Sequence, residues 1–164
     1  MTFNLQTLTP KVYDRHCHWM RCALGEAEQA GAAGDVPVGA VVVDGMGQLI
    51  AQGGNRKERD RNPTAHAEIL VIQAASQRLQ TWRLEDCTLY VTLEPCPMCT
   101  GAILQARLGL LVYGTDDPKT GTIRSLLNLP DHSCSNHRLP VLAGIEAAAC
   151  RAQLSQWFAQ RRRG

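Results

Sequence analysis

Two short motifs constrain this chain more than any other feature of its sequence. One is His66-Ala67-Glu68, and the other is Pro95-Cys96-Pro97-Met98-Cys99. Together they supply an imidazole, a carboxylate and two thiols. An imidazole and two thiolates suit a zinc ion that keeps its fourth position for water, as catalytic zinc sites do. The carboxylate of Glu68 would then be free to move protons beside that water.

The same motifs predict where two helices begin. Pro97 separates the two cysteines, and proline is tolerated at the first position of a helix. The apolar run 101–104 follows, so we expect both thiols in the first turn, projecting to one side. His66 and Glu68 likewise precede the apolar run 69–72. We expect two helix N-termini, facing each other across a sheet edge, to bring the four groups together.

Each motif has a simpler interpretation when it is taken alone. A lone Cys-x-x-Cys is typical of a redox pair, and a lone His-x-Glu usually lies on a helix surface. The two motifs in this order, each at a predicted helix start, favour the catalytic zinc site. His132, Cys134 and His137 also carry metal-binding groups, but they lie in a predicted loop without a carboxylate. We therefore expect one metal site.

The composition fits one domain, residues 1–164, with a substantial core. Hydrophobic residues make up 45% and charged residues 20%, which is ordinary for a soluble globular protein. No run approaches a membrane span and residues 1–9 lack the core of a signal peptide, so we expect a cytoplasmic protein without a membrane partner. Seven cysteines at irregular spacing indicate reduced thiols.

The charge distribution gives only a weak indication of a nucleic-acid partner. The formal net charge is +2. Basic residues gather at Arg161–Arg163 and in the segment 56–61, where Glu58 and Asp60 dilute them. The segment is also explained as a solvated loop, and the arginine tail as a frayed chain end.

Hydrophobic periodicity predicts an α/β architecture. One mixed sheet of five strands is expected, with helices on both faces and a right-handed parallel crossover at the cysteine helix. In the last helix, Ala149, Leu154, Trp157 and Phe158 are expected to contact the core. The expected strands are 36–43, 48–52, 87–93, 108–113 and 139–144, the expected helices are 10–30, 64–79, 97–107 and 145–163, and a helical turn is expected at 123–127.

These motifs resemble the zinc-dependent cytidine and deoxycytidylate deaminase family, whose signature is His-x-Glu followed by Pro-Cys-x-x-Cys. Within it the chain is similar to the bacterial enzymes that act on adenosine in transfer RNA. The similarity covers nearly the whole chain. It includes the segments 35–41, 54–56, 63–68, 89–96, 119–121 and 136–138, together with Asp117 and the helix of Trp157 and Phe158.

The resemblance implies a cytidine-deaminase-like three-layer α/β/α fold and a homodimer. It implies hydrolytic conversion of adenosine to inosine at the wobble position of a tRNA anticodon, with no DNA partner. His66, Cys96 and Cys99 match the zinc ligands, and Glu68 matches the residue that shuttles protons. The departures are Asn62, where relatives often have Asp, an altered aromatic at position 157, and a cysteine at position 134 in a variable loop.

The resemblance also implies a substrate pocket. Asn55 matches an amide that reads the base, Val38 matches a pocket wall, and the backbone of Ala67 lies beside the base. Asp117 matches a position near the neighbouring nucleotides. Without the resemblance, Asn55 after two glycines and Asp117 before a proline are ordinary turn residues.

Two other hypotheses compete with a tRNA adenosine deaminase. The first is a deaminase of a free base or nucleoside, such as guanine or cytosine, because such enzymes share the cysteine motif. The stretch 136–138 and the arginine-ended helix favour RNA over it. The second is a zinc-stabilised RNA-binding module without catalysis. Glu68 argues against it, because a structural zinc site has no use for a spare carboxylate.

Overall fold

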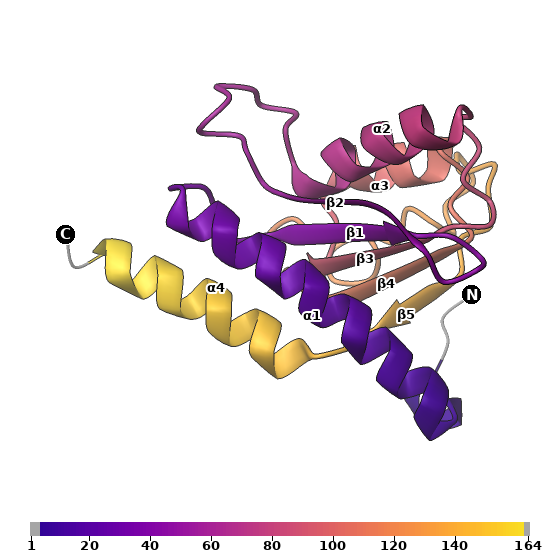
Figure 1. Ribbon diagram of the computed structural model, residues 1–164, viewed down its shortest axis with the longest axis horizontal. Coiled ribbons are helices and arrows are strands. Elements are labelled where there is room, and N and C mark those ends of the chain that lie inside the picture. The colour runs from indigo at the N-terminus through magenta and orange to yellow at the C-terminus, as the bar shows by residue number, and fades with distance from the viewer. Residues whose placement is uncertain (1–3, 163–164) are drawn as a thin grey trace.

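The computed structural model describes residues 4–162, and a five-stranded sheet lies at the centre of this part of the chain. The strand order is β2-β1-β3-β4-β5 (Figure 1). The strands are β1 (Gly39–Val43), β2 (Leu49–Gly54), β3 (Thr88–Leu93), β4 (Leu110–Thr115) and β5 (Val141–Ala143). The helices are α1 (Pro10–Ala32), α2 (Ala67–Leu79), α3 (Pro97–Gln105), α4 (Ala147–Arg162) and the 3-10 turn η1 (Leu5–Thr7).

The sheet is mixed, as predicted. β1 pairs antiparallel with β2 and with β3, whereas β3, β4 and β5 run parallel. The turn between β1 and β2 forms because the side chain of Asp44 accepts hydrogen bonds from the backbone of Met46 and Gln48, at 3.0 and 2.8 Å. Gly47 completes the turn with a φ of +81°, a conformation that glycine adopts without strain. The parallel β3–β4 pair with α3 between them confirms the predicted crossover.

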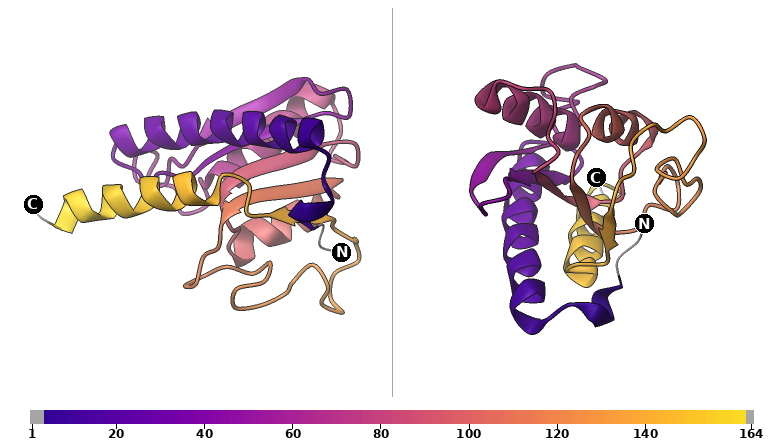
Figure 2. Two further views of the ribbon diagram at one scale, coloured as in Figure 1. Left: turned by 90° about the horizontal axis from the view of Figure 1, so that it is seen from below. Right: turned by 90° about the vertical axis from the view of Figure 1, so that its right-hand side faces the viewer.

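Helices cover both faces of the sheet, with α1 and α4 on one face and α2 and α3 on the other (Figures 1 and 2). Successive strand residues point to opposite faces, so neighbouring side chains enter different cores. Leu89 and Leu111 pack in the core beneath α2 and α3, whereas Tyr90 and Val112 pack in the core beneath α1. The predicted three-layer fold is therefore confirmed.

Several predicted boundaries shift for local reasons. The first strand begins at Gly39 instead of residue 36, because the backbone N–H of Val38 bonds to the carbonyl of Val36 at 2.8 Å and Pro37 has no N–H. The second helix begins at Ala67 instead of residue 64, because Asn62 binds Thr64 in a turn. Residues 122–125 form a turn and no helix.

The last helix buries less than the sequence predicted. Leu154 and Trp157 are partly buried, and the indole N–H of Trp157 donates to the carbonyl of Gly31 at 3.1 Å. Ala149 is exposed and Phe158 is 45% exposed, so the prediction that these two contact the core was wrong. Ala149 lines an open groove between α4 and α1, which leaves its side chain exposed. None of the helices within residues 4–162 is both long and apolar enough to cross a membrane. All seven cysteines are free thiols.

Candidate functional site

The two sequence motifs meet at adjacent helix N-termini. His66 is the residue that precedes α2, Cys96 precedes α3, and Cys99 lies in the first turn of α3. His66 Nδ1 lies 3.6 Å from Cys96 Sγ and 3.4 Å from Cys99 Sγ. The two helices lie side by side on one face of the sheet, instead of facing each other across its edge (Figure 2).

The spacing of these three donor atoms fits a tetrahedral zinc ion. Zinc lies about 2.3 Å from sulfur and about 2.0 Å from nitrogen, so tetrahedral coordination separates the two donors by about 3.5 Å. The two measured N···S distances, 3.4 and 3.6 Å, bracket that value. Soft thiolates and an imidazole are ligands that zinc prefers, whereas magnesium and calcium prefer oxygen. His66, Cys96 and Cys99 could therefore hold a zinc ion as three protein ligands.

The two thiols and the imidazole shift the pKa values of one another. A hydrogen bond from the Cys99 thiol, together with one from His66, lowers the pKa of Cys96 to about 4. The same bond to Cys96 raises the pKa of Cys99, and the Cys96 thiolate raises the pKa of His66. Cys96 is therefore a thiolate at neutral pH. The partial positive charge of the α3 N-terminus also favours an anion there.

The carboxyl group of Glu68 lies beside these donors in the first turn of α2. It is only 4% exposed, and burial raises its pKa. A carboxyl group in this position can accept a proton from a neighbouring group and return it. Its position two residues after His66 leaves the three donor atoms free to face each other.

A cavity of about 170 Å³ opens onto this cluster. Of the eight site residues predicted from the sequence, seven line it: Val38, Asn55, His66, Ala67, Glu68, Cys96 and Asp117. The eighth, Cys99, is fully buried behind them. Sequence reasoning had not placed five further residues in its wall, namely Val36, Lys57, Leu93, Glu94 and Thr120. Each of them lies two or three positions from a predicted site residue in the sequence, and that proximity was the only available signal.

The amide of Asn55 is oriented by the backbone around it. Its Nδ2 donates to the carbonyl of Val36 at 3.2 Å, and its Oδ1 accepts from the backbone N–H of Lys57 at 3.2 Å. An amide has two donor hydrogens and two acceptor lone pairs, so one of each remains for a ligand. Asn55 is therefore both the turn residue and a polar group that can recognise a base.

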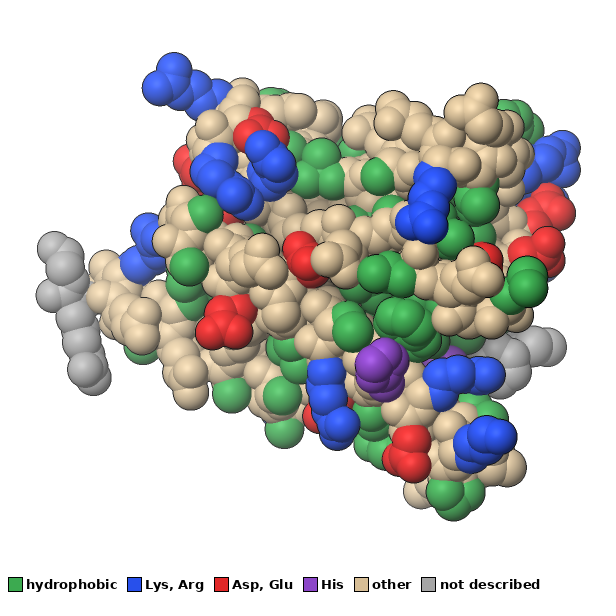
Figure 3. All heavy atoms as spheres, in the orientation of Figure 1, with side chains coloured by type: hydrophobic (Ala, Val, Ile, Leu, Met, Phe, Trp, Pro, Cys, Tyr) green, Lys and Arg blue, Asp and Glu red, His purple; other side chains and the backbone are tan. Residues whose placement is uncertain are grey.

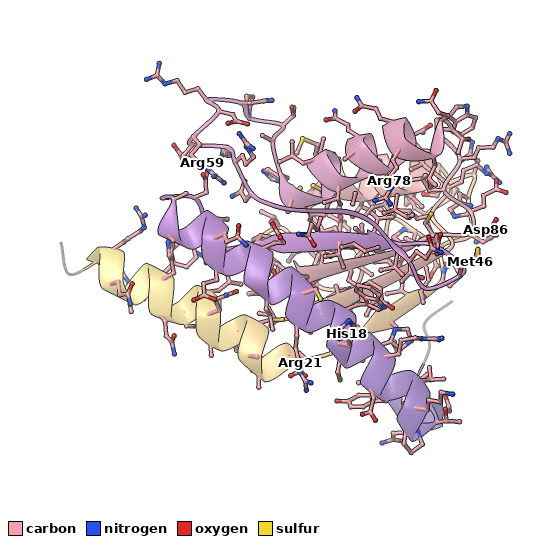
Figure 4. All side chains as sticks on the ribbon, viewed as in Figure 1. His18, Arg21, Met46, Arg59, Arg78 and Asp86 are labelled. Atoms are coloured by element: carbon pink, nitrogen blue, oxygen red, sulfur yellow. The ribbon has the colours of Figure 1, made fainter. Side chains whose placement is uncertain are left out.

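The loop that follows Asn55 is tied to the end of α1. Asp35, which is fully buried, accepts hydrogen bonds from the backbone of Glu58 at 2.7 Å and from Arg59 Nε at 2.9 Å. Figure 4 shows Arg59 on this loop, above the C-terminal end of α1. Arg56 pairs with Asp60 at 3.0 Å. Positively and negatively charged side chains therefore lie next to each other on this loop (Figure 3). Of the basic residues of the loop, Lys57 is the one that lines the cavity.

Asp117 lies on the opposite rim and forms the turn that its sequence context predicts. Its Oδ1 accepts from the backbone of Lys119 at 2.8 Å and of Thr120 at 3.3 Å, and its Oδ2 accepts from the Thr120 hydroxyl at 2.6 Å.

The second group of metal-binding residue types, His132, Cys134 and His137, does not converge on one point. His132 Nδ1 lies 3.1 Å from Cys134 Sγ, but His137 Nε2 bonds to the carbonyl of Leu108 at 2.7 Å.

Known proteins are similar to this chain in sequence and in architecture. The MafB19-like deaminase family matches residues 14–161. A tRNA-specific adenosine deaminase of Haemophilus influenzae is 46% identical over 143 residues, which cover 87% of this chain and 83% of that protein. A solved structure from work on A-to-I editing by tRNA:A34 deaminases has a TM-score of 0.80 at 42% identity, covering 83% of this chain and 98% of that one.

A more distant solved structure tests how far the likeness extends. The guanine deaminase of Nitrosomonas europaea has a TM-score of 0.74 at 25% identity, covering 93% of this chain and 94% of that one. The fold is thus shared with a deaminase of a free base, but the identity is much higher to the tRNA enzymes. The chain belongs to the MafB19-like deaminase family and, by its identity to them, to the group of the tRNA-specific adenosine deaminases.

Proposed function

We propose that this protein is a zinc-dependent enzyme that hydrolyses adenosine to inosine at the wobble position of a tRNA anticodon. One observation carries the chemistry: three zinc-type donors converge beside a buried carboxyl group at the wall of one small cavity. The sequence identity of 46% to a tRNA-specific adenosine deaminase supports the choice of substrate. We assign His66, Cys96 and Cys99 as the zinc ligands.

The chemistry follows from these groups. A zinc ion at the three ligands supplies Lewis-acid activation of the water consumed by hydrolysis. Glu68 accepts a proton from that water as its oxygen attacks the ring carbon that carries the amino group. Glu68 then delivers this proton to the ring nitrogen, takes the remaining proton from the hydroxyl group that has been added to the ring carbon, and passes it to the amino group, which leaves as ammonia. The low exposure of Glu68 keeps bulk water away from these transfers.

The remaining cavity residues hold the base. We assign Asn55 to the polar edge of the base and Val38 with Ala67 to its faces. Val36 and Leu93 add apolar wall. A cavity of this kind takes a base that has left its stack, and a nucleotide in a loop costs least to extrude. An anticodon loop meets that requirement.

The rim of the cavity carries groups suited to the RNA around the base. Lys57 lines the cavity, and Lys119 follows Asp117 on the other side. Neither lysine has an ion-pair partner within residues 4–162. Contacts of lysine with phosphates make binding sensitive to salt. The net charge of +2 limits this basic surface to a local one.

We further propose a homodimer of single-domain chains, 1–164, in the cytoplasm, where transfer RNA is the substrate. A groove between α2 and α3 is lined by Ile72, Ala102, Ala106 and the ring of Trp82, which is 59% exposed. A second copy of the chain would cover this apolar ring and extend the surface that meets a large RNA. Burial of an aromatic ring is a typical anchor of such interfaces.

The experiment that tests the function is competitive. The purified protein is given an anticodon stem-loop with adenosine at the wobble position, beside free adenosine, guanine and cytosine, and the products are quantified. We expect inosine in the stem-loop. Turnover of a free base with none of the stem-loop would support a deaminase of the kind that acts on guanine. RNA binding without any turnover would indicate a zinc-stabilised binding module.

A further inference from the structure

Glu94 is a buried carboxyl group in the cavity wall that the proposed chemistry does not use. It follows β3 directly, precedes Cys96 by two residues and is 1% exposed. No ion pair within the described residues 4–162 involves it. A buried carboxylate without a cation must be stabilised by hydrogen bonds.

Those hydrogen bonds come from one segment of the chain, residues 117–125. Oε1 of Glu94 accepts from the backbone N–H groups of Ile123, Arg124 and Ser125 at 3.0, 2.8 and 3.0 Å. Oε2 accepts from the backbone N–H of Asp117 at 2.9 Å and from the hydroxyl of Ser125. The carboxylate thus holds both ends of the segment, because Oε1 bonds to residues 123–125 and Oε2 bonds to both Asp117 and Ser125.

The segment also packs closely around the carboxylate. Gly121 approaches so near that a Cβ there would collide with Oε2 of Glu94 and with the carbonyl of Asp117. The backbone N–H of Gly121 bonds to that same carbonyl at 3.0 Å. The path of residues 117–121 is therefore defined by the position of Glu94.

This segment carries the far rim of the cavity. Asp117 and Thr120 line the cavity, and their side chains bond to each other across the turn. We propose that Glu94 is a positioning residue: through Asp117 and Thr120 it sets the rim that meets the nucleotides next to the reacting adenosine. This inference rests on the proposed function, because the rim needs a substrate larger than the base.

Other contacts hold the segment independently, so a variant of Glu94 is expected to fold. Thr122 donates from its backbone to the carbonyl of Pro95 at 3.1 Å, and its hydroxyl lies 2.8 Å from that of Thr100. Outside the cavity, Arg124 and Asp116 form a bidentate ion pair at 2.9 and 3.0 Å. These contacts keep residues 122–125 in place when Glu94 is changed.

The test is Glu94→Gln, which keeps the shape of the side chain. Its amide oxygen can still accept from residues 123–125, but its NH₂ group then meets the N–H of Asp117, so two donors face each other. We expect KM for the stem-loop to rise by about 10- to 100-fold, with zinc content unchanged and a much smaller change in kcat. A variant that only lost stability would instead show less active enzyme, with a lower apparent kcat and an unchanged KM. We also expect trypsin to cut the variant faster after Lys119, which is an activity-independent measure of the freed rim.

A double-mutant cycle identifies the route of the effect. If Glu94 acts through Asp117, then Asp117→Ala raises KM in the same way, and the double variant is no worse than the poorer single one. Glu85→Gln, an exposed glutamate paired with Arg107 at 2.9 Å, is the matched control and should leave KM unchanged. An unchanged KM in Glu94→Gln, or additive effects in the cycle, would overturn the inference while the wild-type activity stands. A wild-type protein that deaminates only a free base would remove the proposed function, and this inference with it.

Discussion

Replacing Glu68 by Gln is the sharpest test of the proposed chemistry. The side chain is 4% exposed in the first turn of α2, and glutamine has nearly the same shape, so the packing survives. The three donor atoms of His66, Cys96 and Cys99 do not include Glu68. The substitution therefore removes the proton transfer and leaves the zinc ligands intact.

The expected magnitude follows from what the amide cannot do. General acid–base groups contribute about 10²- to 10⁴-fold to rates, which corresponds to about 3 to 5 kcal/mol of transition-state stabilisation. Glu68 serves several proton transfers in the proposed reaction, so we expect a loss near the upper end of this range. Burial already disfavours the charged carboxylate, as its raised pKa indicates. We therefore expect no loss in the free energy of unfolding.

Three measurements check this prediction on one preparation. Single-turnover deamination of the stem-loop gives the rate, metal analysis gives the zinc content, and thermal unfolding gives the stability. The variant Glu85→Gln, which makes the same substitution at an exposed position outside the cavity, is the matched control and should behave like the unchanged protein in all three measurements. A Glu68→Gln enzyme with full zinc and near-normal turnover would remove Glu68 from the mechanism. Loss of zinc together with activity would instead make Glu68 a ligand.

Three further predictions use other parts of the molecule. Cys99→Ser should lower zinc content well below one equivalent, whereas Cys134→Ser should retain it, as metal analysis will show; the opposite result would refute the ligand assignment. Asn55→Ala should reduce turnover more than RNA affinity, whereas removal of Arg161 to Arg163 should weaken RNA affinity and leave zinc binding unchanged. Filter binding measures the affinity and a rate assay measures the turnover; equal losses of both in the Asn55→Ala variant would contradict its assignment to the base. Light scattering at micromolar concentration should report a dimer, and a monomer would refute the proposed homodimer.

The sequence predicted the zinc-type donors because their spacing carries the information. Pro97 after Cys96 marks a helix start, and His66 before an apolar run marks another. The sheet, its parallel crossover and the two layers of helices followed from hydrophobic periodicity in the same way. The helix starts were correct to within three residues, because the turn at Asn62 and Thr64 depends on side-chain bonds that periodicity does not encode.

The last helix shows where periodicity fails. Apolar residues on a helix face predict burial, but Phe158 remains 45% exposed, while the polar edge of Trp157 bonds to a carbonyl on α1. Burial there depends on how far α1 and α4 overlap, which is a tertiary property. The exposed Phe158 is available to a partner, and a single sequence does not distinguish a core residue from an interface residue.

The two buried carboxylates beside the cavity were the hardest features to predict. Glu94 bonds mainly to backbone N–H groups, and Asp35 bonds to one backbone N–H and to the guanidinium of Arg59. All these partners lie more than twenty positions away, and such bonds leave no spacing signature in the sequence. Each one holds a loop that forms one rim of the cavity, with Lys57 on the first loop and Asp117 on the second. The zinc-type donors sit on helix ends, which are rigid, whereas the rims sit on loops that would be mobile without these anchors. Chemistry and substrate selection are thus supported by separate parts of the fold, so a change in a loop anchor alters a rim of the cavity while the donor atoms stay in place.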